Sequence, residues 1–251
     1  MKKWIVLILL LFSVNVYAGN LLVGQGGLGV TSAVGEAGCV SGALFTYNGD
    51  HSSGTNYGCD SAGASIAGTN NGLDSISADY ISFNAVNENL DFLVDASEID
   101  VIDDCTIYAD FYIPTAVGTQ VIFESYKDAD NNLFCEIYDA DQVRCFFEGN
   151  TTVQNALSTL NSGNFATETW YRIGLSWDAE ADAGGTLAVS VNAVGAATDW
   201  EPDTEDIDSW ASAPEEFTIG EKDCQISPSE TIWIRDVIII DGFEATDPKA
   251  P

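Results

Sequence analysis

Apolar and polar residues alternate with a period of two along much of the chain from Tyr80 to Ile240. This period is typical of a β-strand that buries one face. The clearest predicted strands each carry a set of apolar residues on one face: Ile107, Ala109, Phe111 and Ile113; Tyr171, Ile173, Leu175 and Trp177; Leu187, Val189 and Val191; Phe217 and Ile219. The run from Thr231 to Ile240 is apolar on both faces, which predicts a central strand covered on both sides.

Turn-forming residues separate these runs at Asp128 to Asn132, Asp178 to Gly185 and Asn192 to Gly195. The stretch from Asn48 to Asp79 is dense in Gly, Ser, Asn and Asp, so we expect a loop there. The pattern contains no convincing amphipathic helix and no internal repeat. Many short strands divided by turns predict an all-β sandwich or barrel.

The first eighteen residues have the pattern of an export signal. Lys2 and Lys3 precede an apolar run from Trp4 to Phe12, and Val16-Tyr17-Ala18 supplies small residues at a cleavage site. The apolar run is short for crossing a bilayer, so we expect cleavage after Ala18 and no membrane span in the mature chain. The protein would then be secreted, periplasmic or attached to the cell surface.

Acidic residues dominate the charge of the chain. It has 39 Asp and Glu against 8 Lys and Arg, a formal net charge of −31, and removal of Lys2 and Lys3 would make the charge more negative. Such a chain repels polyanions, which argues against nucleic acid or an anionic membrane as a partner.

All six cysteines lie after the export signal, at Cys39, Cys59, Cys105, Cys135, Cys145 and Cys224. An even number in an exported chain favours disulfides over metal ligation. The strands Leu133–Tyr138 and Gln142–Phe147 flank Asp139-Ala140-Asp141, and a three-residue hairpin loop would place Cys135 opposite Cys145. We therefore predict a Cys135–Cys145 disulfide, with Cys39–Cys59 and Cys105–Cys224 as the remaining pairs.

The order and content of the strands resemble the laminin-G-like, pentraxin-like members of the concanavalin A-like lectin/glucanase superfamily. The most specific segment is Thr169 to Asp178, and further matching segments are Ala43 to Asp50, Tyr80 to Val94, Cys105 to Pro114 and Ile234 to Ile239. The resemblance implies an antiparallel jelly-roll β-sandwich of two facing sheets. It divides the chain into a signal peptide (1–18), a Gly-rich arm (19–38), the sandwich (39–243) and a C-terminal tail (244–251).

The same resemblance implies one structural calcium ion, for which Asp50, Asp60 and Asp236 are the candidate ligands. Hard oxygen donors on loops suit calcium. Asp128, Asp130 and Asn132 also have an oxygen spacing found in calcium loops. Without the later Gly and bidentate Glu of an EF-hand, we favour a polar hairpin turn for that group.

Aromatic residues supply the candidate ligand contacts. Trp200 and Trp210 lie in an acidic segment that we expect to be an exposed insertion. There they either stack on sugars or fold back over the sandwich edge. Tyr108, Asp110 and Tyr112 share the outward face of their strand, where they either extend a sugar platform or form a solvated β face.

The sequence offers only weak candidates for a set of catalytic residues. Glu98 to Asp103 resembles the Glu-x-Asp-x-x-Glu strand of laminarinase-type glycosidases, but its last residue is Asp103 and the Trp-Pro lead-in is absent. His51, the chain's one histidine, lies in the Gly- and Ser-rich stretch, which gives no basis for a Ser-His-Asp set. We therefore expect a binding module rather than an enzyme.

Three functions remain open at this point. The first is a glycan- or surface-binding module supported by calcium, with an extracellular glycan or cell-surface component as partner. The second is a structural subunit of an extracellular assembly that self-associates through residues 19–38 on a neighbour's open sheet edge. The third is a diverged glycosidase that uses Glu98 and Asp100. The fold alone does not decide among them.

Overall fold

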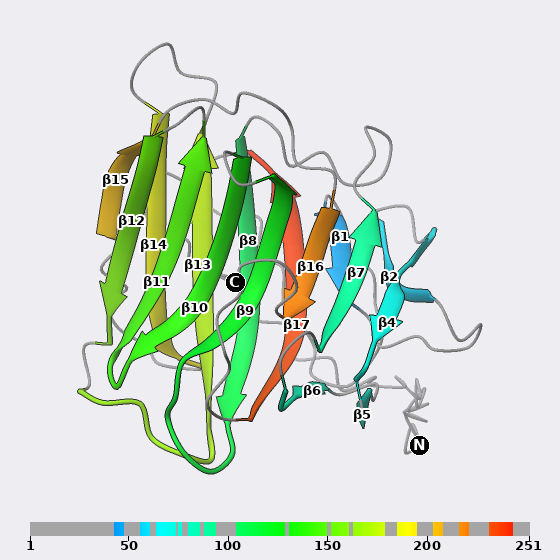
Figure 1. Cartoon of the computed structure of the whole chain (residues 1–251), viewed down its shortest axis with the longest axis horizontal. Coiled ribbons are helices and arrows are strands. Elements are labelled where there is room, and N and C mark those ends of the chain that lie inside the picture. The colour runs from blue at the N-terminus through cyan, green and yellow to red at the C-terminus, as the bar shows by residue number, and fades with distance from the viewer. Residues whose placement is uncertain are drawn as a thin grey trace, which may run out of the picture.

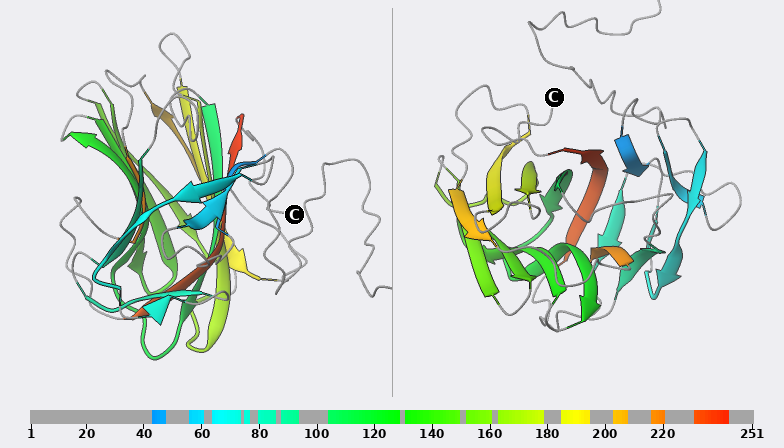
Figure 2. Two further views of the ribbon diagram at one scale, coloured as in Figure 1. Left: turned by 90° about the vertical axis from the view of Figure 1, so that its right-hand side faces the viewer. Right: turned by 90° about the horizontal axis from the view of Figure 1, so that it is seen from above.

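A computed structural model describes residues 43–47, 56–60, 64–73, 75–76, 80–85, 88–93, 104–128, 131–149, 152–160, 163–178, 185–194, 203–207, 216–220 and 231–242. These residues form two β-sheets that pack face to face (Figures 1 and 2). All strand pairings among them are antiparallel. The expected all-β sandwich is confirmed.

The ten-stranded sheet, here sheet A, has the order β15-β14-β13-β8-β17-β1-β2-β3, with β6 also paired to β17 and β5 paired to β6. Its strands are β1 Ala43–Tyr47, β2 Asn56–Cys59, β3 Ser65–Ala67, β5 Ser75–Ile76, β6 Ile81–Phe83, β8 Asp104–Ile113, β13 Thr169–Asp178, β14 Gly185–Ala193, β15 Asp203–Ile207 and β17 Ile232–Asp241.

The seven-stranded sheet, here sheet B, lies in front in Figure 1 and has the order β12-β11-β10-β9-β16-β7-β4. Its strands are β4 Thr69–Asn71, β7 Asn89–Leu93, β9 Gln120–Asp128, β10 Asn131–Asp139, β11 Gln142–Gly149, β12 Thr152–Thr159 and β16 Glu216–Gly220.

The inner faces of the two sheets form one apolar core. The alternating residues predicted for the inward face of β8 are all fully buried, as are those of β13 except for Tyr171, which is nearly so. Large aromatic side chains fill the space between the sheets, among them Phe45, Phe92, Phe111, Phe123, Phe147, Phe217 and Trp177. Burial of these side chains is the main stabilising contribution, since each removes a large apolar area from water.

The strand β17 is central, as its apolar sequence predicts. It pairs with β8 on one side and with β1 and β6 on the other. Its pairing with β8 shifts register between Arg235 and Ile238, and Asp236 has a φ of 51° at this irregularity. The bulge separates an outward Trp233 and Arg235 from the apolar end of the strand.

Two expected loops contain strands instead. The stretch from Asn48 to Asp79 includes β2, β3, β4 and β5, and the acidic segment around Trp200 includes β15, which pairs with β14. In the first stretch, Gly58 is a packing residue, because a Cβ there would lie 2.2 Å from Cε2 of Phe45. In the second, the acidic sequence belongs to a strand at the edge of sheet A, where charge discourages pairing with another chain.

The hairpin β10–β11 confirms the predicted disulfide. Cys135 lies opposite Cys145, the two form a disulfide, and their Cα atoms are 4.2 Å apart. The turn differs from the expected three-residue loop, because a register shift between Ile137 and Asp139 brings Asp139 opposite Gln142. The register of the cysteines is unaffected by this change.

The remaining predicted disulfides have different outcomes. Cys59 is disulfide-bonded, and its expected partner Cys39 lies outside the described residues. Cys105 is instead a buried thiol whose Sγ donates to the carbonyl oxygen of Ile240 at 3.2 Å. Its side chain lies on the core face of β8 with Ile107, which gives it the environment of a small apolar residue. Cys224 lies outside the described residues.

Candidate functional site

The outer face of sheet A gathers aromatic and charged side chains from β8, β13 and β17. Tyr112 lies opposite Trp170 on one side and Trp233 on the other. One step along the strands, Asp110 lies opposite Arg172 and Arg235. Outward positions in adjacent antiparallel strands meet directly, so the strand register builds two neighbouring rows on this face.

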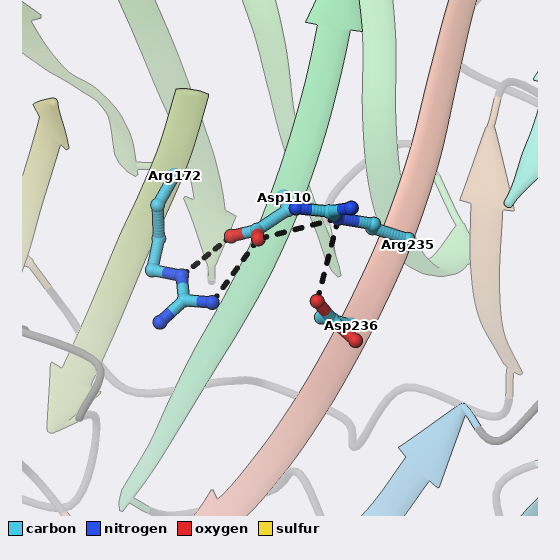
Figure 3. A network of polar contacts seen from close by, with 4 residues as sticks. All are labelled: Asp110, Arg172, Arg235 and Asp236. Atoms are coloured by element: carbon cyan, nitrogen blue, oxygen red, sulfur yellow. Dashed lines mark hydrogen bonds and ion pairs between the residues drawn. The ribbon is translucent and has the colours of Figure 1, made fainter. Parts of the chain in front are cut away.

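The charged row centres on Asp110, which is fully buried (Figure 3). Arg172 donates from Nε to Oδ1 of Asp110 at 2.5 Å and from a terminal nitrogen to Oδ2 at 3.1 Å. The Nε atom of Arg235 lies 3.6 Å from Oδ2 of Asp110 and 3.4 Å from Oδ2 of Asp236. Two guanidinium groups therefore balance two carboxylates, and the network carries no net charge.

Burial sets the protonation behaviour of this network. It raises the pKa of Asp110 above its ordinary value of 3.8, and the hydrogen bond and charge of Arg172 only partly offset that rise. Burial alone would lower the pKa of Arg172, but its hydrogen bond to Asp110 and the charge of that carboxylate outweigh the effect and raise it. Arg172 therefore stays charged at neutral pH and holds Asp110 in a bidentate pair.

The aromatic row, defined here as Tyr80, Trp233, Tyr112 and Trp170, runs across the strands beside the charged row. Trp233 stacks on Tyr80 with ring centroids 4.5 Å apart and on Tyr112 at 4.7 Å. Trp170 follows at 5.1 Å from Tyr112, in a tilted arrangement. All four side chains are partly exposed to solvent.

Arg235 connects the two rows. Its guanidinium carbon lies 3.9 Å from the centroid of the Trp170 ring, while its Nε faces Asp110 and Asp236. The aromatic face and the carboxylates together hold the guanidinium in one orientation. The rows therefore form one packed surface instead of two separate groups.

The predicted ligand residues fall into three classes. Tyr112 is part of the aromatic row. Tyr108 is only 4% exposed, so its side chain offers little surface for a sugar contact. Trp200 and Trp210 lie outside the described residues, as do Glu98 and Asp100.

The candidate calcium ligands do not assemble in the part of the chain that the structure describes, where no group of three or more His, Cys, Asp or Glu side chains is placed to hold a metal ion. Oδ1 of Asp60, directly after β2, accepts the amide of Ala64, directly before β3, at 2.8 Å. Arg235 lies beside Asp236 and would repel a cation. Asp50 is outside the described residues, and we assign no role to calcium.

Asp128 ends β9 and Asn132 lies near the start of β10, and these two strands pair antiparallel. Asn131 lies opposite Asp128 and donates from Nδ2 to its Oδ1 at 2.8 Å. Asn132 turns toward β11 and donates to Oε2 of Glu148 at 3.4 Å. Asp130 lies outside the described residues.

Sequence reasoning missed Tyr80, Trp170 and Trp233 as site residues, as well as the arginines beside them. A signal was present, because Trp170 and Trp233 occupy outward positions in strands whose inward residues are clear. What the sequence alone lacked was the order β13-β8-β17, which brings these positions side by side.

No protein-family model matches the chain, and no curated protein matches it. The chain does match solved structures. The binding domain of botulinum neurotoxin DC in complex with SialylT is similar with a TM-score of 0.57 and 13% identity, over 83% of this chain and 50% of that chain. The botulinum neurotoxin serotype D binding domain gives a TM-score of 0.57 and 11% identity, over 83% of this chain and 50% of that one.

The receptor-binding domain of the C/D mosaic serotype gives a TM-score of 0.56 and 11% identity, with 80% of this chain and 48% of that chain covered. The chain thus spans about half the length of the structures it matches. At these identities the likeness shows a shared β-sandwich fold and does not by itself assign laminin-G or pentraxin relatives. Among the described residues, no helix is long and apolar enough to cross a membrane.

Proposed function

We propose that this chain is a carbohydrate-binding module of the cell exterior and that the aromatic row on the outer face of sheet A contacts the glycan. The single observation that carries the proposal is the row itself: four aromatic side chains from separate parts of the chain meet on one partly exposed sheet face. Tyr and Trp combine an apolar body with a polar group, which suits surfaces that are apolar at one end and wet at the other.

The geometry of the row defines how a ligand would meet it. Because Trp233 is stacked between Tyr80 and Tyr112, both faces of its ring pack against other rings, and a ligand would meet the edge of this ring. Ring edges carry the positive part of the aromatic quadrupole. They favour oxygen lone pairs, and the polar groups can exchange hydrogen bonds with sugar hydroxyls.

Charge and fold both support a glycan over other partners. The net charge of −31 disfavours nucleic acid and anionic membranes. The fold is shared with receptor-binding domains, one of them solved in complex with SialylT. Export, expected from residues 1–18, is part of the proposal because it would bring the module to extracellular glycans. Calcium is not required by it.

The test is a glycan array followed by titration calorimetry with the wild type, Trp233→Ala and Trp233→Phe. Trp233→Ala opens a gap in the row and should lower affinity at least about tenfold, equal to about 1.4 kcal/mol. Trp233→Phe keeps a stacked ring and should retain most of the binding. A wild type that binds no glycan, or a Trp233→Ala variant that binds as tightly as wild type, would overturn the proposal.

A further inference from the structure

Asp236 adds a carboxylate to the outer face of sheet A, beside the charged row. Strict alternation along β17 would turn Asp236 toward the core, because Ile234 two residues earlier is buried there. A register shift between Arg235 and Ile238 gives β17 one extra residue opposite β8. Asp236 therefore faces outward, where its carboxylate meets Arg235, and Val237 returns to the core.

The backbone of Asp236 has a conformation that residues other than glycine rarely adopt. Its φ is 51°, although the residue lies within a central strand. Glu168 has a similar φ of 58°, but it lies in the turn before β13, where its amide donates to the carbonyl oxygen of Ile113 at 2.7 Å. Left-handed backbone costs free energy in a residue with a side chain, and such strain is concentrated at ligand-binding sites.

The contact with Arg235 is a weak reason for this strained placement. Oδ2 of Asp236 lies 3.4 Å from Nε of Arg235, but that Nε makes no hydrogen bond among the described residues. The Asp236 side chain is 24% exposed, and ion pairs open to water stabilise a protein little. In Figure 3 the other carboxylate oxygen of Asp236 points away from the network. A strained backbone thus holds an accessible hydrogen-bond acceptor on this face.

Arg235 places this acceptor next to the aromatic row. Its guanidinium carbon lies 3.9 Å from the centroid of the Trp170 ring, while its Nε faces Asp236. One guanidinium group therefore separates the carboxylate from the ring. A short oligosaccharide that lies against the row can reach both, because each sugar unit carries hydroxyl groups around its ring.

We infer that Asp236 is a specificity-determining residue of the aromatic row, and that it selects an uncharged glycan whose hydroxyl groups donate to its carboxylate. The inference rests on the proposed function, since Asp236 selects nothing unless a glycan lies on the row. An ionised carboxylate only accepts hydrogen bonds, so sugar hydroxyls suit it. The carboxylate of an acidic glycan is repelled, because Asp236 is more exposed than Arg235, which is 16% exposed.

The test uses the full chain, the neutral glycan that it binds most tightly, and a glycan of the same backbone that carries a uronic acid. The variants are Asp236→Gly and Asp236→Asn, because Gly and Asn both tolerate this backbone conformation. Glu168→Gly is the matched control, since it removes one negative charge from the same kind of backbone position. Titration calorimetry measures affinity, and thermal unfolding measures stability.

Asp236→Gly should bind the neutral glycan at least about tenfold more weakly than wild type, the size of one lost charge-assisted hydrogen bond. Its unfolding midpoint should fall by no more than about 2 °C, or should rise, because glycine relieves the strain. Asp236→Asn should bind the neutral glycan more weakly and the acidic glycan more tightly than wild type does. Glu168→Gly should bind both glycans as wild type does.

Monodeoxy forms of the neutral glycan separate direct contact from an effect through Arg235. Removing the hydroxyl that donates to Asp236 should weaken binding to wild type but leave binding to Asp236→Gly nearly unchanged, as in a double-mutant cycle. If no monodeoxy form behaves in this way, Asp236 does not contact the sugar and the inference is overturned.

Four other results overturn it: wild-type affinity in both Asp236 variants, equal losses in Asp236→Gly and Glu168→Gly, a loss of affinity that accompanies a larger fall in unfolding midpoint, or a wild type that binds the acidic glycan as tightly as the neutral one. Each leaves the proposed function standing if Trp233→Ala weakens binding. A wild type that binds no glycan, or a Trp233→Ala variant that binds like wild type, removes both.

Discussion

Arg235 holds Trp170 and Asp110 together: its guanidinium carbon lies 3.9 Å from the Trp170 ring centroid, and its Nε lies 3.6 Å from Oδ2 of Asp110. The partly exposed aromatic row is thus attached to a buried carboxylate. Changes to the charged row should lower the stability of the whole sheet face, whereas changes to the aromatic row should mainly lower the affinity for the ligand.

Replacing Asp110 with alanine should destabilise the protein by about 3 kcal/mol, because two largely buried arginines lose their central carboxylate. Urea unfolding followed by circular dichroism measures this change. Asp236→Ala is the matched control: its side chain is 24% exposed, and its loss should cost less than about 1 kcal/mol. Equal effects of the two substitutions would show that Asp110 is not the centre of the network.

Mild acid should stabilise the protein. Burial raises the pKa of Asp110 above 3.8 and of Glu136 above 4.5, so the folded chain takes up protons at higher pH than the unfolded chain does. This contribution is fully present below those ordinary values and is lost as the pH rises through the raised values of the folded state. Protonation also reduces the self-repulsion of a chain with net charge −31.

The free energy of unfolding should therefore rise between neutral pH and about pH 5, where carboxylates begin to bind protons. Urea titrations at several pH values, each at constant ionic strength, measure the slope. Asp110→Asn carries no titrating group at this position and should show a shallower slope than wild type. A stability that falls steadily on acidification from neutral pH would contradict the assignment.

Removal of the Cys135–Cys145 disulfide should cost about 3 kcal/mol, the loop-entropy contribution for a bridge with a sequence separation of 10. The double variant Cys135→Ala/Cys145→Ala, unfolded in guanidinium under non-reducing conditions, tests this value. Both sulfurs lie in the core, so part of the loss will come from the cavity left behind. Cys105→Ala, which removes a buried thiol without a disulfide, separates the two contributions.

Gly220 and Gly163 offer a matched pair of glycine substitutions. Their φ values are 91° and 92°, so alanine is strained at both positions. A Cβ at Gly220 would lie 2.4 Å from Cε1 of Phe83, whereas a Cβ at Gly163 meets nothing within 4 Å. Gly220→Ala should therefore cost about 1–3 kcal/mol more than Gly163→Ala, the usual penalty for overpacking. Thermal unfolding of the two variants measures the difference.

The sequence predicted those parts of the fold that depend on side-chain alternation. The inward residues of β8 and β13, the central position of β17 and the Cys135–Cys145 register all follow from local patterns. The short strands β2 to β5 did not, because their Gly, Ser and Asn content is that of a loop, and they form strands only through pairing with neighbours such as β1, β6 and β7. The position of Gly58 against Phe45 is visible only when both strands are placed.

The candidate site was predicted only in part, because alternation within one strand does not show which strands lie beside it. Tyr112 was identified because alternation along its strand places it on the outward face. The same alternation did not reveal that Tyr108 on that face is buried. Trp170 and Trp233 have equally regular outward positions. Their stacking against Tyr112 depends on cross-strand register, which a single sequence does not contain.

Asp110 pairs with arginines on both neighbouring strands, so the charged row also fixes the alignment of β13 and β17 against β8. A slip of one residue would turn the arginine of the slipped strand toward the core. A slip of two residues would keep it on the outer face but move it away from the buried carboxylate. The row therefore penalises misaligned strand pairings while the sheet forms.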